Sequence, residues 1–497
     1  MSLDAYSMCP GGTGKRIKFC CKDLLPDLQE IHRMYRGDQN AACLKRIEQA
    51  ERKAPDRACL LALKCMILAE MERSDERWAT VKRFVEKHPD NPIALAEQAA
   101  LIAAADDGDV HAAMSFLQRA IELSGKIVPQ VYDAMGAVAH RFLLNKQFIP
   151  AMALRKMQNL LRDDDPQPIE AMELNIESAI PLLMKEPPKF LPCPADGPWK
   201  TEFGAINQAV SSMQWQRAAN LLTALIAQAP DMPMLWRNLA AVQGWLGNTE
   251  GCIEAYRKYA TMYIRGIDIP SLEDASEAEA LAMFLSGDPL GDREELQVLT
   301  CEIGDVEAVQ AAIAAAPRVV SVPPETLDDI PTSKAVFLLL DRLPLTAENI
   351  ATTTAEQVPC PVASMFLYEQ ETGNGGEPDR AARIEIVATA GRLAEEVQAW
   401  LNDLVPETRG VVPTMKLVSR LSASSQLLRC HWYLPSDLPS EPVFHLHDQF
   451  ISHAILHQWT AMPLGVFGGK SPREAAADPA QHVKLMAAIL VLEHWTE

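Results

Sequence analysis

The stretch that decides the fold lies at residues 233–260 and reads PMLWRNLAAVQGWLGNTEGCIEAYRKYA. Its apolar residues recur at three- and four-residue spacing on each side of Gly247, which predicts two helices joined by a turn at that glycine. Trp236 is bulky and is expected to pack between helices. Ala240 and Cys252 are small, as needed where two helices cross closely. The stretch therefore predicts a helix–turn–helix unit.

The same kind of unit recurs earlier in the chain. Pro55 and Pro89 each follow a helical segment and are 34 residues apart, and Pro230 ends another such segment. This period and pattern resemble the tetratricopeptide repeat family, which implies a solenoid of stacked helix pairs. Weaker units are expected at residues 40–55, 56–89, 110–124 and 131–165, and Trp215 to Pro230 resembles the second helix of a further unit.

The texture of the chain changes after Pro331. Residues 334–340, 362–368 and 382–388 are short apolar or alternating runs, which predict strands. The chain from Ser471 has the spacing of a capping box, and an apolar helix is expected at its end. The sequence thus predicts a mainly α protein, in which a tetratricopeptide-like helical solenoid precedes a smaller α+β domain with a helical C-terminus.

The proline-rich and charged stretches suggest where these parts divide. The predicted parts are a motif at 1–24, a first repeat block at 25–166, a Pro-rich linker region at 167–199, a second repeat block at 200–266, an acidic helical connector at 267–330 and the α+β domain at 331–497.

The charge of the chain excludes some partners. The net charge is -20, and residues 271–350 hold 16 acidic against 4 basic residues. Such a chain repels nucleic acid and anionic membranes.

No run reaches the ~18 apolar residues of a membrane span, and residues 1–21 lack the apolar core of a secretory signal. The 11 cysteines are an odd number and indicate reduced thiols, so a cytoplasmic protein is expected.

A cysteine motif stands near the N-terminus, where residues 9–21 read CPGGTGKRIKFCC. It resembles the SEC-C motif, a short zinc-binding module found at the end of the SecA translocase and in many bacterial proteins. The resemblance implies zinc held by Cys9, Cys20 and Cys21. Gly11 stands where the motif has its second cysteine. Two alternatives remain for this motif. His32 or solvent supplies the fourth ligand, or the motif is a turn that holds no metal.

Histidines gather in the C-terminal part. Five of them fall within 27 residues, at His431, His445, His447, His453 and His457. His453 and His457 are four apart on a predicted helix, a spacing that can hold a metal, although packed or solvated histidines are the simpler interpretation. The chain has no Gly-x-Ser-x-Gly elbow, and Gly14-Lys15 lacks the flanking residues of a phosphate-binding loop.

These features lead to two functional hypotheses. The first is a non-enzymatic adaptor or scaffold, whose helical-repeat groove binds a protein or peptide with a basic or neutral contact segment. The second is an enzyme with a histidine-containing site in residues 331–497 and the repeats as a targeting arm. The sequence does not specify the oligomeric state.

Overall fold

The computed structural model describes residues 3–125, 127–161, 184, 186–195, 197–266, 271–322, 333–345, 353–371, 380–392, 396–405, 414–429, 432–434 and 440–496. The chain divides into two compact units, Met1–Ala282 and Met283–Glu497. The first unit holds the helical repeats and the second holds a sheet with helices. Across the described residues, we find no helix that is both long and apolar enough to cross a membrane.

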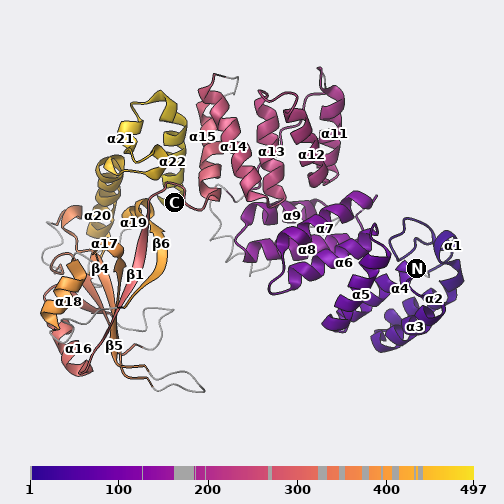
Figure 1. Ribbon diagram of the computed structural model, residues 1–497, viewed down its shortest axis with the longest axis horizontal. Coiled ribbons are helices and arrows are strands. Elements are labelled where there is room, and N and C mark those ends of the chain that lie inside the picture. The colour runs from indigo at the N-terminus through magenta and orange to yellow at the C-terminus, as the bar shows by residue number, and fades with distance from the viewer. Residues whose placement is uncertain are drawn as a thin grey trace. The chain divides into compact units, whose positions relative to one another are not determined.

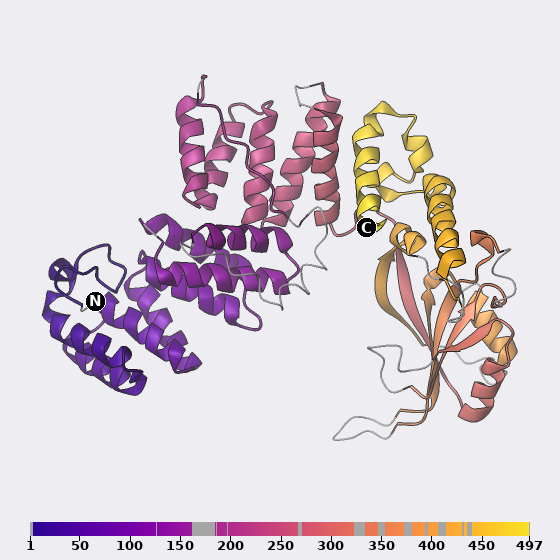
Figure 2. The same cartoon turned by 180° about the vertical axis from the view of Figure 1, so that it is seen from behind.

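The first unit is a succession of helices that pack side by side in pairs, including α4 with α5, α6 with α7, α8 with α9 and α13 with α14 (Figures 1 and 2). The helices are α1 (Ile17–Cys20), η1 (Lys22–Leu24), α2 (Leu25–Tyr35), α3 (Asn40–Lys53), α4 (Ala58–Glu70), α5 (Ser74–Lys87), α6 (Pro92–Ala104), α7 (Val110–Leu123), α8 (Pro129–Leu144), α9 (Phe148–Leu160), α11 (Lys200–Ser211), α12 (Trp215–Ile226), α13 (Pro233–Trp245), α14 (Thr249–Ile264) and α15 (Leu272–Leu285). The predicted helical solenoid is therefore confirmed as a fold.

The unit at residues 233–260 forms α13 and α14 as predicted. Ala240 and Cys252 are buried where the two helices meet. Gly247 adopts a φ of +77°, and a Cβ atom there would come within 2.7 Å of the Phe142 ring. Only glycine adopts this φ without strain and fits the space beside Phe142, so the turn packs closely on α8.

The prediction that Trp236 packs between helices is wrong. Its side chain is only half-buried, and its indole N–H donates a 2.8 Å hydrogen bond to the Pro230 carbonyl. Trp236 lies in the first turn of α13, so its ring covers the preceding loop. Trp215 and Trp245 fill the space between helices instead, with ring centroids 5.4 Å apart.

The second unit is built on one six-stranded antiparallel sheet, in the order β2-β3-β4-β5-β1-β6. Helices α16 and α18 pack on one face (Figure 1), where their buried side chains join those of the strands in one apolar core. The strands are β1 (Arg293–Glu302), β2 (Val319–Val322), β3 (Ala335–Leu340), β4 (Pro361–Tyr368), β5 (Arg383–Thr389) and β6 (Thr414–Ser422). The helices are α16 (Val306–Ala314), α17 (Ala390–Arg392), α18 (Gln398–Leu404), α19 (Ala423–Leu428), α20 (Ser440–His453), η8 (Ala454–Gln458), η9 (Trp459–Ala461), η10 (Gly465–Phe467), α21 (Pro472–Ala475), η11 (Pro479–Gln481) and α22 (His482–Thr496), and η5 (Ala355–Gln357) precedes β4.

The predicted acidic helical connector is different in the structure. Residues 267–330 contain α15, but they also contain β1, α16 and β2 of the sheet unit. The acidic Glu294 and Glu295 lie at the start of β1, which is exposed or half-buried, whereas Leu299 and Cys301 further along point into the core. Buried and exposed residues thus alternate only in the second half of β1. The acidic residues around this short stretch hide its strand pattern in the sequence.

Candidate functional site

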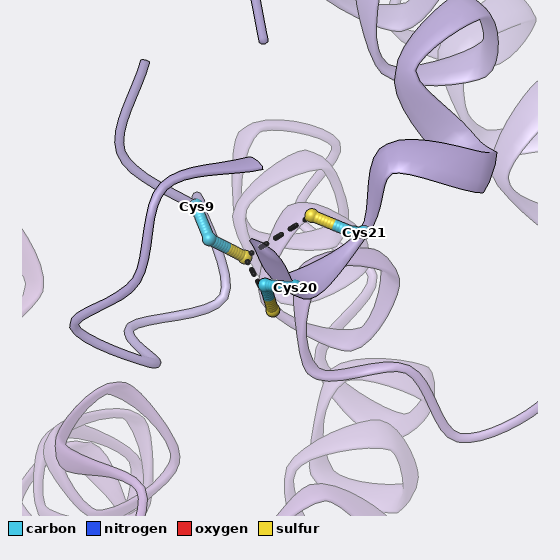
Figure 3. A group of neighbouring side chains, drawn as sticks. All are labelled: Cys9, Cys20 and Cys21. Carbon is cyan, nitrogen blue, oxygen red and sulfur yellow. Dashed lines mark hydrogen bonds between the residues drawn. The ribbon is translucent and has the colours of Figure 1, made fainter. Parts of the chain in front are cut away.

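The three cysteines of the N-terminal motif come together in one cluster (Figure 3). Cys9 lies in a turn that its amide closes by donating to the Lys15 carbonyl at 2.9 Å, while Cys20 and Cys21 lie at the end of α1. The Sγ atom of Cys9 is 3.5 Å from that of Cys20 and 3.4 Å from that of Cys21. The Thr13 hydroxyl donates to Cys20 Sγ at 3.3 Å.

The cluster favours a thiolate at Cys9. Hydrogen bonding from Cys59 is the largest cause that lowers the pKa of the Cys9 thiol, to about 5, and the Gly11 amide and the other two thiols add to it. Burial, together with the neighbouring Cys9, raises the pKa of Cys21 well above its usual range. Cys9 is therefore the acceptor of the cluster and the surrounding thiols are its donors.

This geometry suits a soft metal ion. The three Sγ atoms lie within 4.8 Å of one another. Sulfur ligands of tetrahedral zinc, at Zn–S distances near 2.3 Å, are about 3.8 Å apart. A small adjustment of the side chains would thus place all three thiolates on one ion. His32, the predicted alternative ligand on α2, does not belong to the cluster.

A fourth cysteine, which the sequence did not indicate, lies beside this cluster. Cys59, in the first turn of α4, is 1% exposed and packs in the same buried core cluster as Cys9 and Cys21, beside the group of three sulfur atoms. It follows Cys21 by 38 residues and stands in an apolar run, where a cysteine reads as an ordinary core residue. No spacing in the sequence marks it.

A second feature of the first unit is an open groove of about 560 Å³ between α7 and the start of α14. Four glutamines line it, at Gln118, Gln147, Gln216 and Gln243. The Gln118 Oε1 atom accepts a hydrogen bond from the backbone N–H of Gln216 at 3.1 Å. Its Nε2 atom, like the Oε1 atom of Gln147, is buried and has no hydrogen-bond partner within the described parts of the chain.

In the predicted proline-rich linker region, residues 186–195 are not helical, and they pack on the repeats. Residues 186–195 run along α11 and α13. The Asn238 side chain accepts from the Leu191 amide at 2.8 Å and donates to the Leu191 carbonyl at 2.7 Å. Asn207 makes the same pair of bonds to Cys193, both at 3.0 Å. Carboxamides of this array therefore bind both polar groups of an extended backbone.

The predicted histidine cluster is largely dispersed along α20 and η8. The rings of His453 and His457 lie 5.0 Å apart, and His453 Nδ1 is 3.4 Å from a Glu356 carboxylate oxygen. His445 instead contacts Gln449, and His447 contacts the Trp432 ring. In the described part of the chain, no group of three or more metal-ligating side chains includes a histidine. His431 lies outside the described residues.

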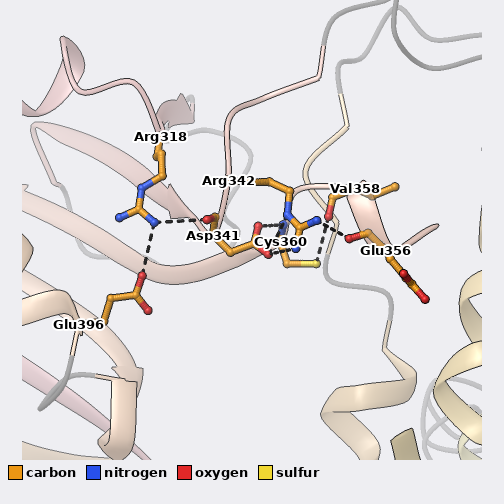
Figure 4. A network of polar contacts seen from close by, with 7 residues as sticks. All are labelled: Arg318, Asp341, Arg342, Glu356, Val358, Cys360 and Glu396. Atoms are coloured by element: carbon orange, nitrogen blue, oxygen red, sulfur yellow. Dashed lines mark hydrogen bonds and ion pairs between the residues drawn. The ribbon is translucent and has the colours of Figure 1, made fainter. Parts of the chain in front are cut away.

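A polar network in the second unit joins the end of β3 to the segment before β4 (Figure 4). The Asp341 carboxylate accepts from the Arg342 guanidinium at 2.8 Å and from the Cys360 amide at 2.9 Å. Arg342 also donates to the Glu356 carbonyl, and Arg318 bridges the Asp341 carbonyl to Glu396. Burial raises the pKa of the Cys360 thiol. These contacts hold two loops together.

Comparison with known proteins adds little to this description. No family model and no curated protein sequence matches the chain. A solved structure of PilW, described as a widely conserved type IV pilus biogenesis factor, matches at 11% sequence identity and a TM-score of 0.22, over 53% of this chain and 85% of that one. A TM-score this low does not establish a shared fold, so the repeat architecture rests on the helix pairs described above.

Proposed function

We propose that the chain is a non-enzymatic adaptor, and that the glutamine-lined groove of the first unit binds an extended segment of a partner protein. The observation that carries the proposal is the pair of buried carboxamide atoms without partners, Gln118 Nε2 and Gln147 Oε1. A buried amide without a partner costs about 1–3 kcal/mol, so a ligand that pairs with both gains free energy. The terminal torsion of glutamine is broad, which lets both groups turn toward the groove.

The chain's own segment supports this mode of binding. Asn238 and Asn207 each bind the N–H and the C=O of one backbone residue in residues 186–195. A peptide backbone presents the same donor and acceptor in every residue. A groove with one free donor and one free acceptor is therefore suited to an extended backbone, independent of the partner's side chains.

The net charge indicates what kind of partner approaches. A chain of net charge -20 attracts cationic segments through long-range steering, leaves neutral ones unaffected and repels phosphate-rich ones. We expect the complex to form more slowly as ionic strength rises, because exposed charges are screened beyond about 8 Å at physiological salt.

The test begins with a photo-crosslinking residue at Ser115, which is exposed at the groove, and a control at Glu48, exposed on α3. A partner crosslinked from Ser115 and not from Glu48 is then purified. The double change of Gln118→Leu and Gln147→Leu should weaken its binding about tenfold, since two hydrogen bonds contribute roughly 1–3 kcal/mol. The exposed Gln228→Leu on the surface is the control. Equal affinity of all three chains would exclude the groove.

We also propose that the cluster of Cys9, Cys20 and Cys21 holds zinc in a structural role. The three cysteine sulfur atoms lie at distances close to those of a zinc site, and zinc bound there would fix the N-terminal turn without taking part in a reaction. The purified chain should carry close to one zinc ion, and Cys20→Ser should remove it. A chain that refolds in zinc and still carries none would refute this proposal.

A further inference from the structure

The position of Gly11 shows why the motif lacks a cysteine there. A Cβ atom built on Gly11 would lie 2.4 Å from the backbone nitrogen of Cys59 and 2.8 Å from its Cα atom. These atoms are backbone atoms of α4 and cannot give way. The first turn of α4 therefore occupies the space that a side chain at residue 11 would need.

The residue that fills this space is itself a cysteine. Cys59 is almost completely buried and packs in the same core cluster as Cys9 and Cys21. Its Sγ atom lies outside the group of three that are within 4.8 Å of one another, so a rotation of its side chain is needed to reach a shared ion. Cys65, about 1.7 turns further along α4, belongs to a different apolar cluster. Of the two cysteines of this helix, only Cys59 therefore packs in the same cluster as Cys9 and Cys21.

Polar contacts hold α4 and the motif in this arrangement. Arg57, the residue before α4, donates to the Cys20 carbonyl at 2.6 Å and pairs with the Asp23 carboxylate at 3.1 Å. The Asn91 side chain donates to the Gly11 carbonyl at 2.6 Å, while its oxygen caps α6. The approach of Cys59 to Cys9 is therefore supported from both sides of the turn.

We infer that Cys59 is the fourth ligand of the metal site, so that Cys9, Cys20, Cys21 and Cys59 form a closed four-thiolate centre. This inference rests on the proposed zinc site. Four sulfur ligands satisfy tetrahedral zinc and leave no open position, which is the arrangement of a structural site. Arg57 and the N-terminus of α4 place positive charge beside a centre that carries an excess of negative charge.

The consequence is a cross-link between parts of the chain that are far apart in sequence. Zinc bound in this way ties the N-terminal turn to α4, and so joins the motif to the helices of the repeat array.

The test compares the full-length chain with three variants, Cys59→Ser, Cys20→Ser and Cys65→Ser. We expect zinc content to fall from close to one ion per chain to near zero in the first two variants and to stay unchanged in Cys65→Ser, which removes a buried thiol from the same helix. Circular dichroism checks that each variant is folded. Full zinc retention in folded Cys59→Ser would overturn the inference and leave the three-cysteine proposal standing.

A measurement on the unchanged chain guards against a variant that fails to fold. X-ray absorption of the zinc-loaded protein should show four sulfur neighbours at about 2.3 Å. Three sulfurs and one nitrogen or oxygen would exclude Cys59 as a ligand while retaining the metal. An unchanged chain that binds no zinc would instead refute the zinc proposal itself.

Discussion

At the scale of single residues, two tryptophans that occupy similar places in the sequence differ in how deeply their side chains are buried. Trp215 is the first residue of α12, and Trp236 lies in the first turn of α13. Trp215 is 2% exposed and contacts Trp245, whereas Trp236 covers a loop carbonyl. The two side chains differ in burial because Trp215 lies on a helix face that packs on α13, whereas Trp236 lies on a face that meets the preceding loop.

Replacing these two tryptophans should therefore have unequal effects. Trp215→Ala leaves a cavity between helices and should lower the free energy of unfolding by about 3–5 kcal/mol. Trp236→Ala loses one hydrogen bond and partial burial, so it should cost about 1 kcal/mol. Urea unfolding of both variants measures the difference. Equal losses would mean that Trp236 is as buried as Trp215.

Two glycines offer a matched test of backbone constraint. Gly247→Ala places a side chain at a φ of +77° and against the Phe142 ring, so it should destabilise the chain by about 2 kcal/mol or more. Gly204 lies within α11 and has no atom within 4 Å of a built Cβ. Gly204→Ala should stabilise by roughly 0.5–1 kcal/mol, because alanine loses less entropy in a helix. Thermal unfolding of the two variants should move in opposite directions.

At the scale of elements, the proline-rich segment behaves as a strand-like peptide bound to helices. Its prolines cannot be helical, and the side chains of Asn207 and Asn238 satisfy its backbone instead of a partner strand. Trp245 adds a hydrogen bond from its indole N–H to the Pro188 carbonyl at 3.0 Å. The segment thus packs on the second repeat block as a ligand would.

Removing one of these side chains should release the segment. Asn238→Ala leaves the Leu191 amide and carbonyl without partners, at a cost of about 1–3 kcal/mol. We expect trypsin to cleave after the exposed Lys189 faster in this variant than in the unchanged chain. Asn220→Ala, on the exposed face of α12, is the control. An unaltered cleavage rate in Asn238→Ala would show that these bonds do not hold the segment.

At the scale of the whole molecule, the two compact units have separate cores. The proposed zinc site belongs entirely to the first unit, and the core around the sheet belongs to the second. Removal of the zinc ion should therefore increase local unfolding in the first unit only, because a segment opens more easily where its own contacts are lost.

Hydrogen exchange of the intact chain with and without a zinc chelator tests this separation. Exchange should rise in α1, η1 and the first turn of α4 after zinc is removed, and should stay unchanged in β3 and β4. Zinc content is measured in parallel to show that removal is complete. A uniform rise in both units would mean that the site stabilises more than the first unit.

Much of the fold follows from local patterns that the sequence displays. The helix pair at residues 233–260, the turn at Gly247, the strands β3, β4 and β5, and the capping box at Ser471 all lie within a few residues of where the sequence places them. Each depends on periodicity, backbone conformation or capping, which act over a few neighbouring residues.

The tertiary structure alone decided the rest. Strand β1 is recognisable only beside β5 and β6, which pair with it from more than 80 residues away. Cys59 joins the cysteine cluster because α4 packs on Gly11, and the glutamine groove exists because helices of two repeat blocks meet. The physical reason is the same in each case. Such sites are made by contacts between segments that are distant in the sequence, and local sequence patterns do not predict which of these segments pack together.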